Sequence, residues 1–452
     1  MTFLAINWSI VGIKAAQFVL SFSILVILHE FGHFLPAKWF KCRVEKFYLF
    51  FNPWFSLAKK KIGETEWGLG WIPFGGYVKI SGMIDESMDK EQMKLPPKDY
   101  EFRAKKAWQR LIIMLGGVTV NVLLAIVIFI GITWVWGDEH LKPLEAKYGL
   151  AVDSLGKTVG LQDGDIILKI DTNTVKDEAN ITKHIILSEA KNITILRNGK
   201  DSVLQLPESL IRQLNKQKGI GFVELRFPCI VDTVDKKFPA YTAGLRKNDK
   251  IIAVNNVATE YYHLVTQEIK KYKNETIQIK IIRNNADTLI IPIKTTEEGR
   301  IGFNPIANYT QLGFRVDTID YSFTQSILKG TERCFITLQN YLTGIKQLFS
   351  GKANPNESLG SVISIGSVFP GVWDWQSFWT LTAIFSIILA FMNVLPIPAL
   401  DGGHALFTII EIITGKKPSD KFMEYAQTVG MILLLGLMAY ALGLDVFRLF
   451  TK

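Results

Sequence analysis

The chain has 452 residues, of which 48% are hydrophobic, and its mean hydropathy is +0.19. This length allows two or more domains, and the hydropathy is high for a wholly soluble protein. The formal net charge of +9 is distributed beside apolar runs, which indicates membrane orientation and argues against a nucleic-acid-binding protein. Cys42, Cys229 and Cys334 are odd in number and lack metal-type spacing, so no disulfide framework is expected.

Four apolar runs approach or exceed the ~20 residues needed to cross the hydrocarbon core of a bilayer. The runs are Ala15–Leu35, Leu111–Trp136, Phe378–Leu400 and Tyr425–Leu444. The first run is not preceded by a short basic segment or followed by a small-residue cleavage site, so we expect it to be retained as a helix. The sequence therefore predicts a polytopic α-helical membrane protein with four transmembrane helices.

Basic residues accumulate on one side of this predicted membrane region. Residues 36–107 contain 14 Lys or Arg against 9 Asp or Glu, and Lys416, Lys417 and Lys421 lie between the last two runs. If all four helices cross, these two segments share one side, which the positive-inside rule makes cytoplasmic. The long region between the second and third runs is then extracytoplasmic.

The first apolar run contains the motif His29-Glu30-Phe31-Gly32-His33. Two histidines at i and i+4 share one helix face, so their rings can converge on one metal ion. Glu30 is then placed to take a proton from a metal-bound water. Ionisable groups at membrane depth are costly and usually serve a function. The alternative is a chance HExxH pattern on a buried helix.

Residues 47–82 are rich in aromatic and β-branched residues interrupted by Gly and Pro, which predicts strands and turns. We expect a membrane-associated β-hairpin whose edge, around Gly75 and Gly76, could pair with an extended substrate. A hairpin packed only for stability is an equal alternative. Residues 85–106 are charged and contain prolines, and are expected to be a solvated connector.

The region after the second run contains an internal repeat. Residues 160–167 (GLQDGDII) recur as residues 244–251 (GLRKNDKI), and each copy is followed by strand-like runs. With the pattern AGL…D.I..V at 243–254, the two copies resemble PDZ domains of the bacterial envelope type. Two extracytoplasmic α+β modules are therefore expected. Residues 322–349 then show an amphipathic helical stripe, which fits a membrane surface or packing on the core.

A catalytic zinc site usually has three protein ligands and one position open to water. The third ligand is not next to His33, and Asp401 is the only acid contiguous with the third apolar run. Coordinating a metal would give this carboxylate the partner that it needs at membrane depth. The alternative is that Asp401 caps the end of a helix as it emerges into water.

The sequence resembles the site-2 protease family, and most of all its bacterial envelope members, in three features. They are HEFGH in a first apolar helix, tandem PDZ-like repeats and the C-terminal segment NVLPIPALDGGH. The resemblance implies that His29, His33 and Asp401 bind Zn²⁺ and that Glu30 is the general base. It further implies that Asn393 hydrogen-bonds the substrate backbone or the developing oxyanion. Its implied substrates are single-pass membrane proteins, namely anti-sigma factors in envelope-stress signalling and remnant signal peptides.

Some positions depart from the pattern common in that family. Phe50-Phe51-Asn52 stands in place of a Gly-Phe-Gly triplet, Gly117 and Ser361 replace prolines, and Ile388 stands where a second asparagine is frequent. These departures bear on substrate gating and recognition and leave the predicted metal ligands intact.

The expected organisation has nine parts. In chain order they are 1–36, the first span with HExxH; 37–107, the hairpin region and connector; 108–137, the second span; 138–222 and 223–300, the two PDZ-like modules; 301–375, an amphipathic helix and connector; 376–401, the third span; 402–424, a cytoplasmic loop; and 425–452, the fourth span.

The predicted function is intramembrane zinc proteolysis in the bacterial inner membrane. We expect the active site to lie towards the cytoplasm and the two PDZ-like modules to lie in the periplasm. The expected partner is the lipid bilayer, and no nucleic acid is expected to bind. The alternatives are a membrane-anchored zinc peptidase acting on soluble peptides and a non-proteolytic scaffold or transporter.

Overall fold

The computed structural model describes residues 8–83, 96–177, 180–217, 221–284, 286–308 and 310–451. The chain forms two compact units. One, which we call the helical unit, comprises Met1–Gly137, Asp320–Lys346 and Pro355–Lys452. The other, the repeat unit, comprises Asp138–Ile319 and Gln347–Asn354.

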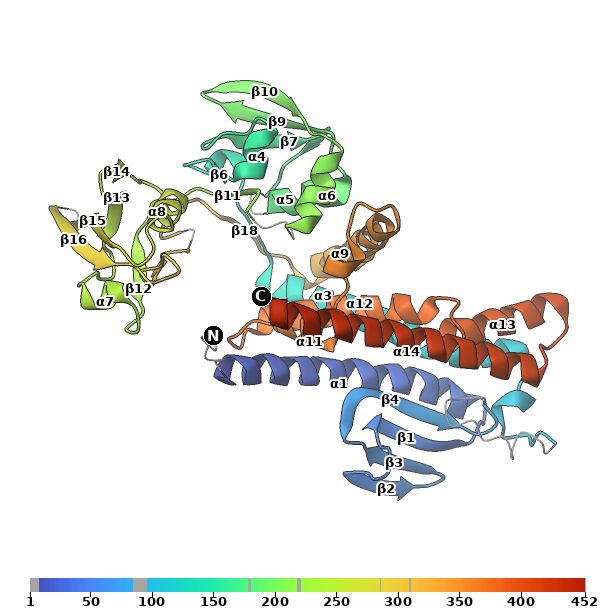
Figure 1. Ribbon diagram of the computed structural model, residues 1–452. Helices are drawn as coiled ribbons and strands as arrows, with labels where there is room; N and C mark the ends of the chain where they lie inside the picture. Colours follow the sequence, from blue (N-terminus) through green and yellow to red (C-terminus); the bar gives the residue numbers. More distant parts are fainter. Residues whose placement is uncertain are drawn as a thin grey trace. The chain divides into compact units, whose positions relative to one another are not determined.

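Long apolar helices dominate the helical unit (Figure 1). Besides most of α9 (Phe323–Phe349), its helices are α1 (Trp8–Trp39), α3 (Ala107–Trp136), α10 (Pro355–Ser358), α11 (Val362–Ser367), α12 (Trp375–Val394), α13 (Asp401–Thr414) and α14 (Asp420–Thr451), with η1 (Phe102–Ala104) before α3. Among the described residues, four helices are long and apolar enough to cross a membrane, with mean hydropathy between 1.8 and 2.7 in their most apolar stretch. They are α1, α3, α12 and α14, in agreement with the four predicted spans.

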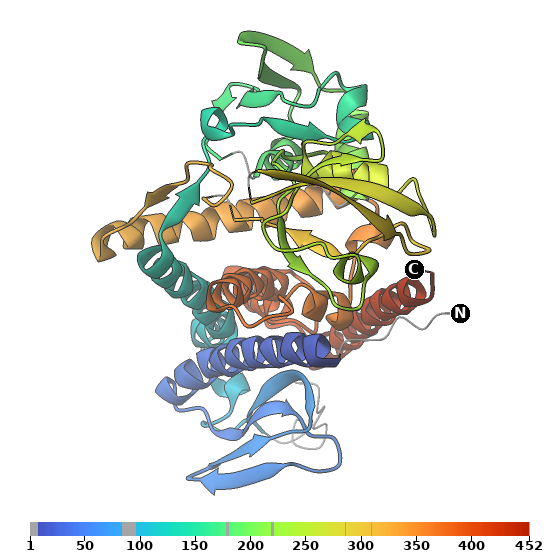
Figure 2. The ribbon, with the colours of Figure 1, turned by 90° about the vertical axis from the view of Figure 1, so that its left-hand side faces the viewer.

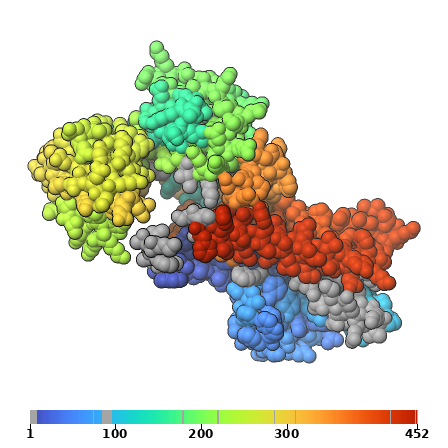
Figure 3. Space-filling view, viewed as in Figure 1, coloured from blue at the N-terminus to red at the C-terminus, as the bar shows by residue number. Residues whose placement is uncertain are grey.

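Helix α3 packs against α1, α12 and α13, so it lies at the centre of the unit. Helix α14 instead runs along the outside, as the space-filling view shows (Figure 3). Its side chains at Val429, Ile432, Leu433 and Leu435 are between 54% and 66% exposed. An exposed apolar face of this extent is unfavourable in water but is accommodated by lipid.

The third span, predicted at 376–401, ends earlier in the structure than the sequence predicted. Helix α12 ends at Val394, and residues 395–400 are not helical. Pro396 and Pro398 explain this end, because proline lacks a backbone N–H and disfavours helical geometry in the residue before it. Leu395 accordingly has φ −57° and ψ 141°.

The predicted loop at 402–424 is also corrected by the structure. Helix α13 occupies Asp401–Thr414 and ends at Gly415, which has the left-handed φ of +69° common at helix ends. Asp401 is therefore the first residue of a separate helix and is not the end of a span.

The segment predicted as a hairpin is a four-stranded sheet. Strands β1 (Val44–Phe51), β2 (Ala58–Ile62), β3 (Thr65–Leu69) and β4 (Ile72–Ile80) are arranged in the order β2-β3-β1-β4. The pairing of β1 with β3 is parallel, and the other two pairings are antiparallel. Strand β4 is an edge strand next to α1, and the sheet lies beside α1 in both ribbon views (Figures 1 and 2). Residues 84–95 of the predicted connector lie outside the described residues.

Ser361 caps α11 and hydrogen-bonds to α14. Both Oγ and N–H of Ser361 donate to Asp445 Oδ2, at 2.6 and 2.8 Å. The N–H and Oγ of Ser364 and the guanidinium of Arg448 donate to the same carboxylate. Asp445 is 4% exposed, and five donors surround it.

The repeat unit contains two four-stranded sheets with the same strand order. The first has the order β10-β9-β7-β8 and the second β16-β15-β13-β14, so each strand of one copy has a counterpart in the other. The strands of these sheets are β7 (Ile166–Ile170), β8 (Asn173–Thr174), β9 (Asn192–Arg197), β10 (Lys200–Gln205), β13 (Lys250–Val254), β14 (Val257–Ala258), β15 (Thr276–Arg283) and β16 (Asp287–Lys294).

Short helices and strand pairs complete the two modules. The helices are α4 (Ser154–Thr158), α5 (Ile181–Ser188), α6 (Ser209–Lys216), α7 (Pro239–Thr242) and α8 (Tyr262–Ile269), with η2 (Pro143–Glu145). The paired strands are β6 (Leu150–Val152) with β11 (Val223–Leu225), β12 (Val231–Val234) with β17 (Phe303–Pro305), and β5 (Asp138–His140) with β18 (Asp317–Ile319). The two hydrophobic cores lie within 150–222 and 229–301.

The same ion pair between a buried aspartate and a partly exposed arginine occurs in both copies of the repeat. The Arg197 guanidinium donates two 2.7 Å hydrogen bonds to Asp165, and Arg283 donates bonds of 2.8 and 2.7 Å to Asp249. In each copy the arginine also donates to a glycine carbonyl, that of Gly160 or Gly244. The side-chain hydrogen bond to the aspartate raises the pKa of each arginine. The sequence repeat is thus a structural repeat.

Residues expected to form an amphipathic helix do so, as α9 (Phe323–Phe349). Its buried side includes Ser326 and Cys334, whereas Phe335 and Leu328 are well exposed.

Candidate metal centre

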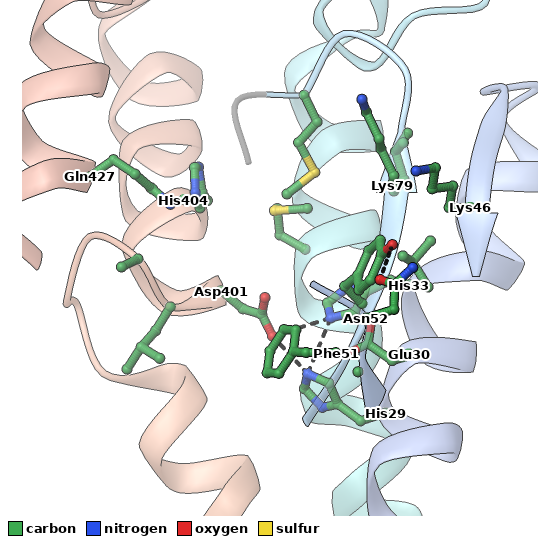
Figure 4. A pocket seen from close by; sticks show the side chains of 18 of the residues that line it. His29, Glu30, His33, Lys46, Phe51, Asn52, Lys79, Asp401, His404 and Gln427 are labelled. Atoms are coloured by element: carbon green, nitrogen blue, oxygen red, sulfur yellow. Dashed lines mark hydrogen bonds and ion pairs between the residues drawn. The ribbon is translucent and has the colours of Figure 1, made fainter. Parts of the chain in front are cut away.

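Three potential metal ligands from distant parts of the sequence meet inside the helical unit (Figure 4). His29 and His33 lie on α1, one turn apart, and Asp401 begins α13. Asp401 Oδ2 is 3.3 Å from His29 Nε2 and 3.2 Å from His33 Nε2, and the two Nε2 atoms are 3.3 Å apart. Both histidines are buried, at 8% and 7% exposure.

The other ring nitrogens of the two histidines face away from this point. His33 Nδ1 lies 2.8 Å from the carbonyl oxygen of Ile113, and His29 Nδ1 lies 3.1 Å from the amide of Asn121. The two Nε2 atoms are therefore the ones available to a metal. Two imidazoles and a carboxylate are a ligand set of the kind used by catalytic zinc.

Asp401 does not act as a helix cap. The N-cap of α13 is Leu400, and its side chain makes no capping hydrogen bond to any residue that the structure describes. Within the described part of the chain, the buried Oδ2 atom of Asp401 accepts no hydrogen bond of good geometry and faces only the two Nε2 atoms. A buried carboxylate oxygen without a donor favours a cation as its missing partner. The residues present therefore fit a zinc ion.

Glu30 lines a cavity of about 720 Å³ together with both histidines and Asp401. This cavity also receives side chains from the β-sheet, from α13 and from α14. They include Lys46, Phe51, Asn52, Tyr77, Lys79, His404 and Gln427. The glutamate, the three potential ligands and a space large enough for a peptide segment thus occur together.

Asn393 lies in the last turn of α12, immediately before the non-helical segment 395–400. Its Nδ2 atom is 3.4 Å from His29 Nε2. The structure therefore places this amide donor beside the potential metal ligands. An N–H donor in this position is of the type that stabilises a developing oxyanion.

Gly75 and Gly76 lie in edge strand β4, and Gly76 faces the cavity and pairs with Leu49 of β1. A Cβ atom at Gly76 would lie 2.7 Å from Val26 and 3.5 Å from the Glu30 side chain, both on α1. The absence of a side chain lets the strand approach the helix closely at the glutamate.

Phe50 has φ +68° and interrupts the pairing of β1 with β4, because Leu49 pairs with Gly76 whereas Phe51 pairs with Ile72. Glycine adopts this conformation without strain, whereas a residue with a side chain rarely does. In this chain a bulky residue occupies it.

Sequence reasoning did not identify α3 as part of the site. Three residues of this helix contact the two histidines. Ile113 does so through its backbone carbonyl, Gly117 through its backbone, which has no side chain, and Asn121 through its neutral amide. Such groups carry little signal in sequence. Two signs were available, namely that Gly117 departs from the pattern expected for the family and that Asn121 is the only carboxamide in the run Leu111–Trp136.

Comparison with known proteins matches residues 17–437 to peptidase family M50. A protein from Haemophilus influenzae named "Regulator of sigma E protease" is 26% identical over 457 residues, covering 96% of this chain and 98% of the relative. "Regulator of sigma-E protease RseP" from Escherichia coli is 24% identical over 452 residues, with the same two coverages. A relative from Rickettsia conorii whose name contains "zinc metalloprotease" is 27% identical over 444 residues, again covering 96% and 98%.

The family match spans most of the sequence and includes every potential ligand described above. The predicted family, the metalloprotease activity and the dependence on zinc are thereby confirmed. This chain belongs to peptidase family M50, the site-2 protease family of zinc metalloproteases.

Proposed function

We propose that this protein is an endopeptidase that cuts single-pass transmembrane proteins within the bacterial inner membrane, with zinc held by His29, His33 and Asp401. The observation that carries the proposal is the convergence of these three ligand atoms, all within 4.8 Å of one another, in the unit that contains the membrane-length helices. A site built on spanning helices is accessible to a substrate helix in the same bilayer.

The residues around the cavity supply the remaining chemistry. A bound zinc ion would acidify a water molecule and polarise the scissile carbonyl. Glu30 would accept the proton of the attacking water and return it to the leaving amine, because it lines the cavity beside His29. Asn393 Nδ2 would donate a hydrogen bond to the carbonyl oxygen as negative charge develops there.

A helical substrate must unwind before it can be cut, because its carbonyls are engaged in hydrogen bonds within the helix. Edge strand β4 is suited to receive the unwound segment, since one of its sides is not paired with another strand of the sheet. Residues 76–80 of β4 line the cavity next to Glu30. Pairing with β4 would therefore place an extended peptide beside the general base.

The two modules of the repeat unit would lie in the periplasm as PDZ-like domains that exclude substrates with bulky ectodomains. The charge asymmetry of the sequence supports this orientation, with the metal site towards the cytoplasm. By resemblance to the family, the substrates would be anti-sigma factors already trimmed by another protease and remnant signal peptides. The names of the relatives from Haemophilus influenzae and Escherichia coli accord with the first class.

Cleavage of a tagged single-pass protein in detergent or vesicles tests the proposal. We expect Glu30→Gln to abolish cleavage and to retain zinc, because Glu30 is not among the three grouped ligands. Glu332→Gln is the matched control, since Glu332 pairs with Lys329 on α9 and neither residue lines the cavity. Equal cleavage by Glu30→Gln and the wild type would refute the proposed role of Glu30. Cleavage of soluble peptides alone would favour a surface peptidase.

A further inference from the structure

One face of α3 lies against the HEFGH motif of α1. Ile113, Gly117 and Asn121 are spaced by four residues, so they follow one another along a single side of the helix. All three are buried, and all three contact a histidine of the metal centre. Helix α3 thus supports both imidazole rings while contributing no ligand to the group that the structure brings together.

Gly117 lets the rings approach the helix. A Cβ atom there would lie 2.5 Å from His33 Nε2 and 2.6 Å from a ring carbon of His29. Such distances are far below van der Waals contact. The histidines are therefore seated directly on the α3 backbone, and the residues on either side of Gly117 fix their orientation.

A histidine that binds a metal through Nε2 must carry its proton on Nδ1, and the partner of Nδ1 sets this tautomer. For His33 that partner is the Ile113 carbonyl oxygen at 2.8 Å, which can only accept a hydrogen bond. For His29 it is the side chain of Asn121 at 3.1 Å. Because a carboxamide can accept or donate, the role of Asn121 is not fixed by its residue type.

The accepting role of Asn121 follows from the tautomer of His29, because ligation through Nε2 leaves the proton on Nδ1 and that N–H needs an acceptor, which the carboxamide oxygen can be. Asn121 is fully buried, and its Oδ1 atom has no hydrogen-bond partner among the residues that the structure describes. Rotation of the amide about its terminal torsion brings this oxygen to the position facing His29 Nδ1. Ser386 Oγ of α12 donates to the Asn121 backbone carbonyl at 2.7 Å, which fixes this turn of α3 in place.

We propose that Asn121 is a positioning residue that accepts the Nδ1–H hydrogen bond of His29 and thereby holds its Nε2 lone pair toward the metal. The inference rests on the proposed zinc site and adds to it a residue outside the ligand set. Loss of such a hydrogen bond to a metal-binding histidine typically lowers metal affinity by about 10–100-fold.

Zinc affinity measured on the full-length purified protein, by competition with a chelator, tests this inference. We expect Asn121→Leu to weaken zinc binding by about 10–100-fold. We expect Asn121→Asp to retain wild-type affinity or exceed it, because a carboxylate can only accept. The control is Thr133→Val, which alters another fully buried polar side chain of α3, three turns from Asn121, whose hydroxyl has no partner among the described residues.

The two Asn121 variants distinguish orientation from packing. If Asn121 were needed only as a donor or for its shape, Asn121→Asp would lose zinc at least as strongly as Asn121→Leu, since it also buries a charge. That result, or an Asn121→Leu zinc affinity within twofold of wild type, would overturn the proposed role of Asn121 and leave the proposed zinc site unaffected. A wild-type protein that binds no zinc would instead overturn the proposed metal site together with it. The absorption spectrum of the cobalt-loaded variants gives a second readout in case Asn121→Leu folds poorly.

Discussion

The chain buries two kinds of carboxylate, which differ in what surrounds them. In the repeat unit, Asp165 and Asp249 are each 1% exposed, and each accepts two hydrogen bonds from an arginine and one from a backbone N–H. In the helical unit, Asp401 Oδ2 is also buried, but among the described residues it faces only the Nε2 atoms of His29 and His33.

The difference indicates two roles. Asp165 and Asp249 stabilise the fold, whereas Asp401 is suited to bind a cation. Removing an ionised carboxylate from water is unfavourable by several kcal/mol unless a partner compensates. The chain itself provides that partner for Asp165 and Asp249. A carboxylate in the helical unit can also have donors from the chain itself. Asp445, on a spanning helix, is surrounded by five of them. Asp401 differs from all three.

Substituting Asp401 should have the largest effect on activity and little effect on folding. We expect Asp401→Asn to lower cleavage of a single-pass substrate by at least about a thousandfold, the scale on which loss of a catalytic group acts. The thermal unfolding midpoint of the zinc-free protein should change little, because the variant removes an unfavourable buried charge together with its contacts to the two histidines. Cleavage within tenfold of wild type, or marked destabilisation of the zinc-free protein, would show that Asp401 is a structural acid.

The converse is expected for Asp249. Asp249→Asn should destabilise its module by about 1.5–3 kcal/mol, because Arg283 loses the ionised acceptor of two of its hydrogen bonds. Hydrogen exchange of β13 and β15 measures this effect, and Asp165→Asn provides the matched variant, which should act on β7 and β9. Zinc content should stay at the wild-type value in both. If either variant lost zinc without faster hydrogen exchange of its strands, the structural carboxylates could not be distinguished from the metal-binding one.

Asp445 should give a smaller structural effect. Four of the five donors to Asp445 are uncharged, and an asparagine keeps one acceptor oxygen, so Asp445→Asn is expected to destabilise the protein by about 0.5–1.5 kcal/mol. The thermal unfolding midpoint of the full chain should fall while bound zinc is retained. If this variant lost zinc as completely as Asp401→Asn, the two carboxylates of the helical unit could not be assigned different roles.

Much of the site could be predicted from sequence because its strongest signals are local. His29 and His33 lie one helical turn apart, and Asp401 is the only acid contiguous with the third apolar run. The four spans followed from length and hydropathy in the same way. The beginning of α13 at Asp401 was missed because the motif around it was interpreted as the end of a span, although Pro396 and Pro398 end α12 earlier.

Features that depend on distant pairing were missed. The parallel alignment of β1 with β3 joins strands that are not consecutive, and an expected hairpin is therefore a mixed sheet. The Asp165–Arg197 pair joins two conspicuous parts of the repeat that are 32 residues apart. The support from α3 was also missed, because a glycine, a carbonyl group and one asparagine become informative only when the histidines lie against them.

The zinc content of the purified full-length protein tests the central claim most directly. The wild type should hold about one zinc ion per chain. A variant carrying both His29→Asn and Asp401→Asn should hold none, whereas Asp445→Asn, made in the same unit, should hold as much as the wild type. A double variant that still binds one zinc ion per chain would contradict the assignment of His29, His33 and Asp401 as the metal ligands.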